Sequence, residues 1–142
     1  MSEPLFADTL FVSYRKDAPR EGRIPYTSGA ALTAEVLGRL EEQILAGRVR
    51  SVQMNDVTGT SSLEADFRDD WATVYIVREE TRYYELVNRE APEDETPLSI
   101  TGDGPTPKKH ATRDLPLMAA IIGGFARNGA PLPDCLWEES IH

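Results

Sequence analysis

Four short segments between residues 51 and 88 constrain most strongly how this chain can fold. They are rich in β-branched and aromatic residues, which favour strands, and they cover residues 51–57, 63–67, 72–78 and 82–88. The connections between them are polar and only a few residues long. Such connections join antiparallel neighbours, because a parallel pairing needs a crossover of a dozen residues or more. The block therefore predicts an antiparallel β-meander.

Alternation within the second segment predicts which face of the meander is buried. Leu63, Ala65 and Phe67 fall on one side of the strand, because successive side chains of a strand point to opposite faces. Glu64 and Asp66 fall on the other side. One face of the sheet is therefore expected to join the core, and the opposite face is expected to be acidic.

The next two segments have apolar residues on both faces, so either face could be partly covered. If the row that starts at Ala72 points inward, Tyr75 shares the outer face with the acids of the second segment. Tyr83 and Glu85 extend that face if Tyr84 and Leu86 point inward. Tyrosines among carboxylates are typical of protein contact surfaces, because the ring supplies contact area at a low entropic cost.

The flanking sequence predicts one helix before the meander and one after it. Apolar residues recur at helical spacing from Leu32 onward, and Gly47 is placed to end that helix. Residues 10–14 have the composition of a strand, and residues 135–137 could form a short last strand or an extended tail. We therefore predict an α+β fold, with an antiparallel sheet of about five to six strands and an N-terminal and a C-terminal helix packed on it, in a single domain of residues 1–142.

The second helix is predicted over residues 115–128, the longest apolar run of the chain. Asp114 can cap its N-terminus, and Gly129 is placed to stop it. The run is well short of the roughly 20 residues that cross a bilayer. Gly123 and Gly124 weaken a helix interior, which suggests close backbone packing against the sheet.

Nearly all of the charge imbalance lies in one stretch of the chain. Residues 55–103 hold thirteen Asp and Glu against four Arg, whereas the remainder has eleven of each sign, so the net charge of −9 is local. Such a block is either a binding face for a basic partner or simply a solvated acidic surface. The low density of Lys and Arg argues against a partner that is a nucleic acid or an anionic membrane.

Motifs for catalysis or metal binding are absent from the sequence. His110 and His142 occur at no recognisable ligand or catalytic spacing, and we expect both to be surface groups. Cys135 has no second cysteine to pair with, and the first 17 residues do not read as a secretory signal, so a cytoplasmic protein is expected. No catalytic residue, metal ligand or cofactor is predicted, and the chain is not expected to be an enzyme.

The C-terminal segment carries a recognisable combination of residues. An apolar helix with Phe125 is followed by a turn at Gly129 and by the pair Trp137 and Glu138. This ending, preceded by an acidic meander and an N-terminal helix, resembles the first-named immunity-protein family of bacterial polymorphic toxin systems. The residues alone favour packing roles for Phe125 and Trp137, in the core or against the last helix.

The resemblance implies a cytosolic protein that binds a cognate toxin domain, such as a nuclease or a deaminase, and blocks it without chemistry. The expected partner has a basic active-site cleft, which an acidic face could fill in place of phosphates. Neither a nucleic acid nor a membrane is expected as a partner. The toxin-binding residues predicted on this hypothesis are Glu64, Asp66, Asp69, Asp70, Tyr75, Glu79, Glu80, Tyr83 and Glu85.

Two other functions remain open on the sequence. A small metal-dependent or acid–base enzyme could use Glu64 and Asp66 in a pocket beside Tyr75 or Tyr83. An adaptor or chaperone of a secreted effector could use the same acidic face without neutralising any activity. The sequence does not predict the toxin's activity, the contacting face of the sheet or the oligomeric state.

Overall fold

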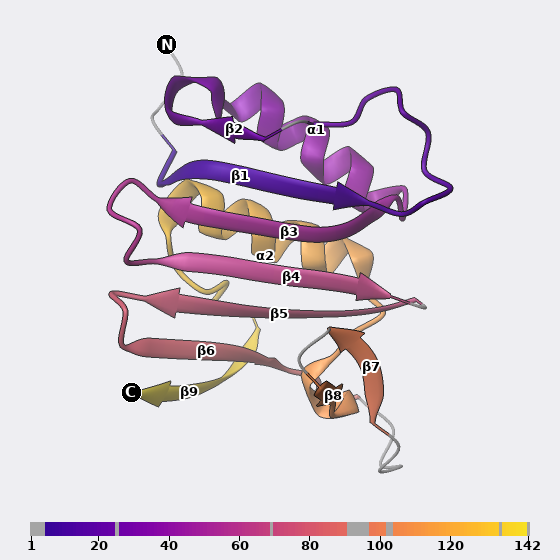
Figure 1. The fold of residues 1–142 in the computed structure, drawn as a ribbon. Coiled ribbons are helices and arrows are strands. Elements are labelled where there is room, and N and C mark those ends of the chain that lie inside the picture. The colour runs from indigo at the N-terminus through magenta and orange to yellow at the C-terminus, as the bar shows by residue number, and fades with distance from the viewer. Residues whose placement is uncertain are drawn as a thin grey trace.

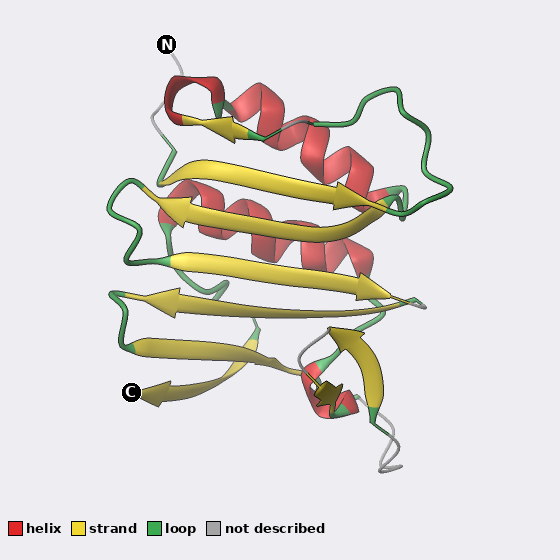
Figure 2. Cartoon of the chain, viewed as in Figure 1, coloured by secondary structure: helices red, strands yellow, loops and turns green. Residues whose placement is uncertain are grey.

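A sheet and two helices form two layers in the computed structural model (Figures 1 and 2). The structure describes residues 5–24, 26–68, 70–90, 97–101, 104–133 and 135–141. Within these residues the sheet has seven strands. In sheet order they are β2 (Thr27–Ser28), β1 (Ala7–Tyr14), β3 (Val49–Asp56), β4 (Ser62–Arg68), β5 (Trp71–Arg78), β6 (Arg82–Val87) and β9 (Leu136–Ile141).

The helices are α1 (Ala34–Leu45) and α2 (Leu115–Asn128), and both lie on the same face of the sheet (Figure 1). A separate ribbon of two strands, β7 (Leu98–Thr101) and β8 (Gly104–Thr106), lies near the end of β6. Two short 3₁₀ turns complete the described elements: η1 (Gly29–Ala31) and η2 (Lys108–His110).

The predicted α+β fold and its antiparallel meander are confirmed. Strands β3, β4, β5 and β6 pair in chain order, each antiparallel to the next. The sheet has one strand more than the upper predicted number because β2 pairs with β1 at one edge. At the other edge the predicted last strand forms as β9, which pairs with β6. The last strand is six residues long, whereas the sequence suggested three residues of strand or tail.

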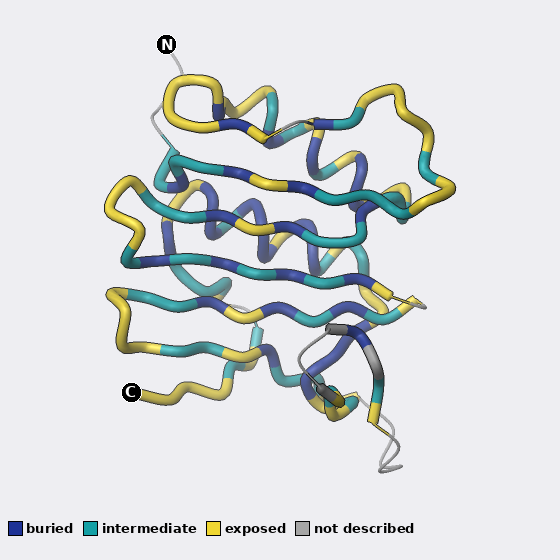
Figure 3. The backbone as a smooth tube through the Cα atoms, viewed as in Figure 1, coloured by how far each residue is buried: buried dark blue, intermediate teal, exposed yellow. Residues whose placement is uncertain are grey.

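The core lies between the sheet and the helices, and the predicted alternation is confirmed (Figure 3). Leu63, Ala65 and Phe67 are buried on β4, and the row that starts at Ala72 is buried on β5. We call the face of the sheet away from the helices the open face. It is open because both helices cover the same side in the described part of the chain.

Helix α2 begins and ends where the sequence predicts. The Asp114 carboxylate accepts a hydrogen bond from the backbone N–H of Leu117 at 3.0 Å and thereby caps the helix. Gly129 follows the last turn with φ 70°, a left-handed conformation that glycine adopts without strain. The rings of Phe6 and Phe125 of α2 pack edge to face, with centroids 5.7 Å apart and an angle of 82° between the ring planes.

The prediction that Gly123 and Gly124 allow close packing of α2 against the sheet is wrong. A Cβ atom on Gly123 would lie 2.7 Å from the Glu41 side chain of α1, so the close approach is to the neighbouring helix and not to the sheet. Glu41 accepts a hydrogen bond from the guanidinium of Arg127 at 3.0 Å in this gap. A Cβ atom on Gly124 would meet the side chain of Leu132 at 3.6 Å.

Candidate functional site

The open face consists of side chains that lie opposite one another across the strands. One row crosses six strands, because the pairing registers place its members directly opposite each other. The row consists of Phe11, Gln53, Glu64, Tyr75, Glu85 and Glu138. Aromatic and acidic side chains alternate along part of this row, so carboxylates flank the ring of Tyr75 on both sides.

Five of the predicted binding residues share the open face, as predicted. Asp66 lies two residues along β4 from Glu64, on the same face, and Tyr83 lies on β6 opposite Val77. Tyr75 donates a hydrogen bond from its hydroxyl to Glu64 at 2.6 Å. This bond fixes the direction of the tyrosine side chain, so its ring forms a wall over β5.

The acids of the turns do not join this group, and that part of the prediction is wrong. Asp70 lies in the turn from β4 to β5, whereas Glu79 and Glu80 lie in the turn from β5 to β6. Consecutive hairpin turns of a meander lie at opposite ends of its strands, and β5 has 8 residues. The two turns are therefore about 25 Å apart. Asp69 lies outside the described residues.

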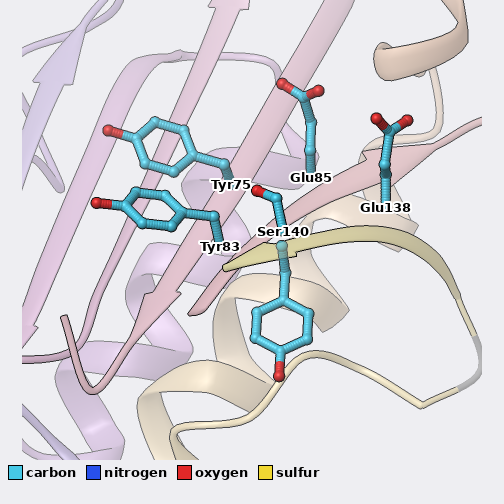
Figure 4. Close-up of a pocket in the computed structure, with 6 residues that line it drawn as sticks. Tyr75, Tyr83, Glu85, Glu138 and Ser140 are labelled. Atoms are coloured by element: carbon cyan, nitrogen blue, oxygen red, sulfur yellow. The ribbon is translucent and has the colours of Figure 1, made fainter. Parts of the chain in front are cut away.

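A hollow of about 210 Å³ opens on the outer face at β5, β6 and β9 (Figure 4). The rings of Tyr75 and Tyr83 lie side by side along one wall, and the carboxylates of Glu85 and Glu138 point in one common direction beside them. Ser140 lies between these two pairs. The full lining is Tyr75, Tyr83, Tyr84, Glu85, Glu138 and Ser140. The hollow therefore combines aromatic surface with two negative charges.

His110 is buried, which corrects the expectation that it is a surface group. It is 5% exposed, and its ring nitrogen Nδ1 lies 2.9 Å from the carbonyl oxygen of Leu86. The other nitrogen, Nε2, lies 3.2 Å from Glu85 and 3.5 Å from Glu138. The histidine therefore joins η2 to β6 and β9 and holds the two carboxylates of the hollow near each other.

The sequence did not indicate Glu138 or His110 as site residues. Glu138 faces Glu85 only because β9 pairs with β6, although about fifty residues separate the two in the chain. His110 follows two lysines in a loop, which is typical of an exposed segment. The only signal for Glu138 is that it lies opposite Glu85 when β9 pairs with β6. That signal can be used only once β9 is known to join the sheet.

The opposite end of the open face is more apolar. Phe11, Tyr26 and Val57 are all exposed and line a second hollow of about 510 Å³. Asp56 also lines it, and partial burial of this carboxyl acts to raise its pKa. Hydrogen bonds from the Thr58 hydroxyl and from backbone N–H groups of the turn outweigh burial and lower the pKa below its ordinary 3.8. This charge is therefore already engaged within its own turn.

Positive charge is sparse where the carboxylates gather. None of the outward-facing residues of β5, β6 and β9, all within the described ranges, is Lys or Arg. Arg113 lies beside the first residue of β5, where its guanidinium carbon is 4.7 Å from the ring centroid of Trp71. The described outward-facing positions of these three strands therefore carry carboxylates and no Lys or Arg.

Comparisons with protein-family models, curated proteins and solved structures found no match. Among the described residues, no group of three or more His, Cys, Asp or Glu side chains is arranged to hold a metal ion. The same part of the chain contains no helix with the length and apolar character that a membrane crossing requires.

The residues on which the family resemblance depends have packing roles. Phe125 is fully buried, and the Trp137 ring packs against the core, as the sequence suggested. The indole N–H of Trp137 donates a hydrogen bond to the carbonyl oxygen of Leu132 at 2.9 Å. Glu138, the neighbour of this tryptophan, points to the open face and lines the hollow.

Proposed function

We propose that this protein is an immunity protein that binds a basic toxin domain and neutralises it by covering its active site. The observation that supports this proposal is the open face of the sheet. It carries tyrosines and carboxylates together, and no Lys or Arg faces outward from β5, β6 or β9 in the described residues. On this proposal the protein acts in the cytosol of the cell that makes the toxin.

The chemistry of the face suits a partner that normally binds phosphates. Carboxylates steer a cationic surface toward them and accept hydrogen bonds from Arg and Lys, as phosphate oxygens do. Tyr75 and Tyr83 supply the broad rings that dominate the energy of many protein interfaces. Binding alone blocks the toxin, so inhibition requires no catalytic residue on this chain.

The binding residues that we propose are those that share the open face: Glu64, Asp66, Tyr75, Tyr83, Glu85 and Glu138. Asp70, Glu79 and Glu80 lie in the turns at the two ends of β5. Because salt largely screens exposed charges that lie more than about 8 Å apart, the turn acids act only weakly on a group bound at the centre of the face.

The test is to co-express the chain with the product of the adjacent gene and to measure affinity and toxin activity at low and high salt. Tyr75→Ala should weaken the complex by about 30-fold, as expected for an aromatic hot spot worth about 2 kcal/mol. Glu85→Gln should weaken it several-fold and reduce its dependence on salt. The matched control is Glu42→Gln, because Glu42 is an exposed glutamate on α1, in the layer away from the open face.

A complex that fails to form at any salt concentration would contradict the proposal. Equal effects of Glu85→Gln and Glu42→Gln would show that the contact lies elsewhere on the surface. A complex that leaves the toxin fully active would favour an adaptor or chaperone that uses the same face.

A further inference from the structure

The strand β9 forms an open edge of the sheet. It pairs with β6 over six successive residues without a register shift, and no described strand pairs with its other side. Proteins usually protect such an edge with Pro, with charged side chains, Lys above all, or with a bulge. The β9 sequence, LWEESI, has no Pro or Lys and pairs regularly, and its two charged residues are glutamates, which repel an acidic strand and attract a basic one. The N–H and C=O groups on the outer side of β9 can therefore pair with a further strand.

A second copy of this chain is a poor occupant of that edge. Two copies of β9 related by a twofold axis pair antiparallel, with the open faces on the same side. The two registers that overlap five residues place either Glu138 or Glu139 directly opposite its own copy. Like charges directly opposite each other destabilise a strand pair, so charge favours a different and basic partner.

The hollow beside β9 has the size and chemistry for one cationic side chain. Its volume of about 210 Å³ is below the roughly 300 Å³ at which small-molecule sites begin. Tyrosine faces attract a cation, and carboxylates accept its hydrogen bonds. Glu138 and Ser140 of β9 line the hollow together with Glu85 of β6, so it begins at the edge and extends inward.

The buried histidine prepares the two carboxylates for a cation. A single Nε2 atom faces both Glu85 and Glu138, at 3.2 Å and 3.5 Å, so it can form a good hydrogen bond with at most one of them. Their side chains are 50% and 61% exposed, so their remaining lone pairs are open to an incoming group. Two like charges held this close together gain from a cation placed between them.

We propose that β9 accepts an extended strand of a basic protein as an eighth strand of the sheet. A Lys or Arg of that strand lies in the hollow between the tyrosine pair and the pair Glu85 and Glu138. Strands lie about 4.8 Å apart, so only a long side chain on the added strand extends over β9 to β6. This inference rests on the proposed function and specifies how the toxin docks.

The probe is a capped seven-residue peptide of alternating Thr and Val with a central Arg, and its binding is measured by fluorescence anisotropy. Replacing the Arg by citrulline keeps the shape and removes the charge, which should weaken binding at least tenfold. Backbone N-methylation along one edge of the peptide should abolish binding, and along the other edge should leave it unchanged, because only one edge pairs with β9. Hydrogen exchange should slow at the amides of β9.

The chain offers a matched pair of variants for the same measurement. Glu138 and Glu139 are neighbours on β9, but Glu138 faces the hollow and Glu139 lies opposite Tyr84, which packs on the core side. Glu138→Gln should weaken peptide binding about tenfold, and Glu139→Gln should change it less than twofold. Equal losses in both variants, or no protection of β9 at millimolar peptide, would overturn the inference.

The two proposals fail in different ways. If the toxin binds, loses affinity with Tyr75→Ala and ignores Glu138→Gln, the function stands and docking at the β9 edge is wrong. If the peptide binds as expected but the product of the adjacent gene does not, docking at the edge stands and the proposed function is wrong.

Discussion

At the scale of single residues, two glycines show how one conformation can serve two different needs. Gly47 has φ 72° after α1 and Gly129 has φ 70° after α2. A Cβ atom on Gly129 would lie 2.5 Å from the ring of Phe6, whereas a Cβ atom on Gly47 would meet nothing within 4 Å. Gly129 is therefore restricted by packing as well as by backbone conformation, whereas Gly47 is restricted by backbone conformation alone.

We predict that Gly129→Ala destabilises the protein by about 2–4 kcal/mol. The left-handed conformation accounts for about 1–2 kcal/mol of this loss, and displacement of the Phe6 ring accounts for the rest. Gly47→Ala is the matched control and should lose only the conformational part. Urea unfolding of both variants provides the measurement, and equal losses would show that Phe6 moves aside without cost.

His110 shows that the residues next to a side chain in the sequence do not decide whether it is buried. The histidine is buried because the ends of β6 and β9 enclose it and supply acceptors for both ring nitrogens. None of those acceptors lies within 20 residues of it in the chain. Its local sequence, two lysines before and an alanine after, gives no sign of them.

At the scale of elements, the turn from β5 to β6 has an unusual sequence. Glu79 and Glu80 have φ values of 52° and 65°, a pair of left-handed residues that hairpin turns usually build from Asn and Gly. The turn is held from outside, since the N–H of Glu80 donates to the carbonyl oxygen of Thr60 at 2.8 Å. Contact with the turn between β3 and β4 thus offsets part of the strain.

We predict that Glu80→Gly stabilises the protein by about 1 kcal/mol, because glycine adopts this conformation without steric strain. Glu80→Gln is the control, since it removes the same charge and keeps the side-chain carbon that causes the strain. Thermal unfolding of the two variants separates backbone from charge. A rise in Tm of equal size in both would identify charge repulsion as the cause.

Elements with local signals were predicted well from the sequence, and the others were not. The caps of α2 and the alternation of β4 are encoded within a few residues, so their positions follow from nearby chemistry. Strand β2 has two residues, too few for any periodicity. Strand β9 has Glu138, Glu139 and Ser140 at its centre and becomes a strand only because β6 offers it an edge.

At the scale of the whole molecule, the distribution of the helices decides which surface is available for binding. Helices α1 and α2 pack side by side on one face of the sheet, joined in part by Glu41 and Arg127. The other face is left to solvent over its centre, and η2 covers one end, where the Thr73 hydroxyl donates to the carbonyl oxygen of His110. The proposed interface is the surface that this asymmetry exposes.

We predict that neutralising the acids of the edge strand promotes self-association. The double variant Glu138→Gln with Glu139→Gln removes the like-charge contacts between two copies of β9, worth about 1 kcal/mol, so pairing should tighten roughly fivefold. Sedimentation velocity over a range of concentrations measures this. The control is Glu35→Gln with Glu42→Gln on α1, which changes the net charge equally. Equal association of the two double variants would assign the effect to net charge alone.

Short-range patterns in the sequence suffice for the two helices, the caps of α2, the antiparallel meander and the acidic outward face of β4, because each depends on side chains a few residues apart. Three placements follow only from the folded molecule: the turn acids lie at opposite ends of the sheet, β9 brings Glu138 beside Glu85, and His110 is buried against both. These placements depend on strand order and on which face the helices cover. Both are set by the packing of the whole core, and no local pattern encodes them.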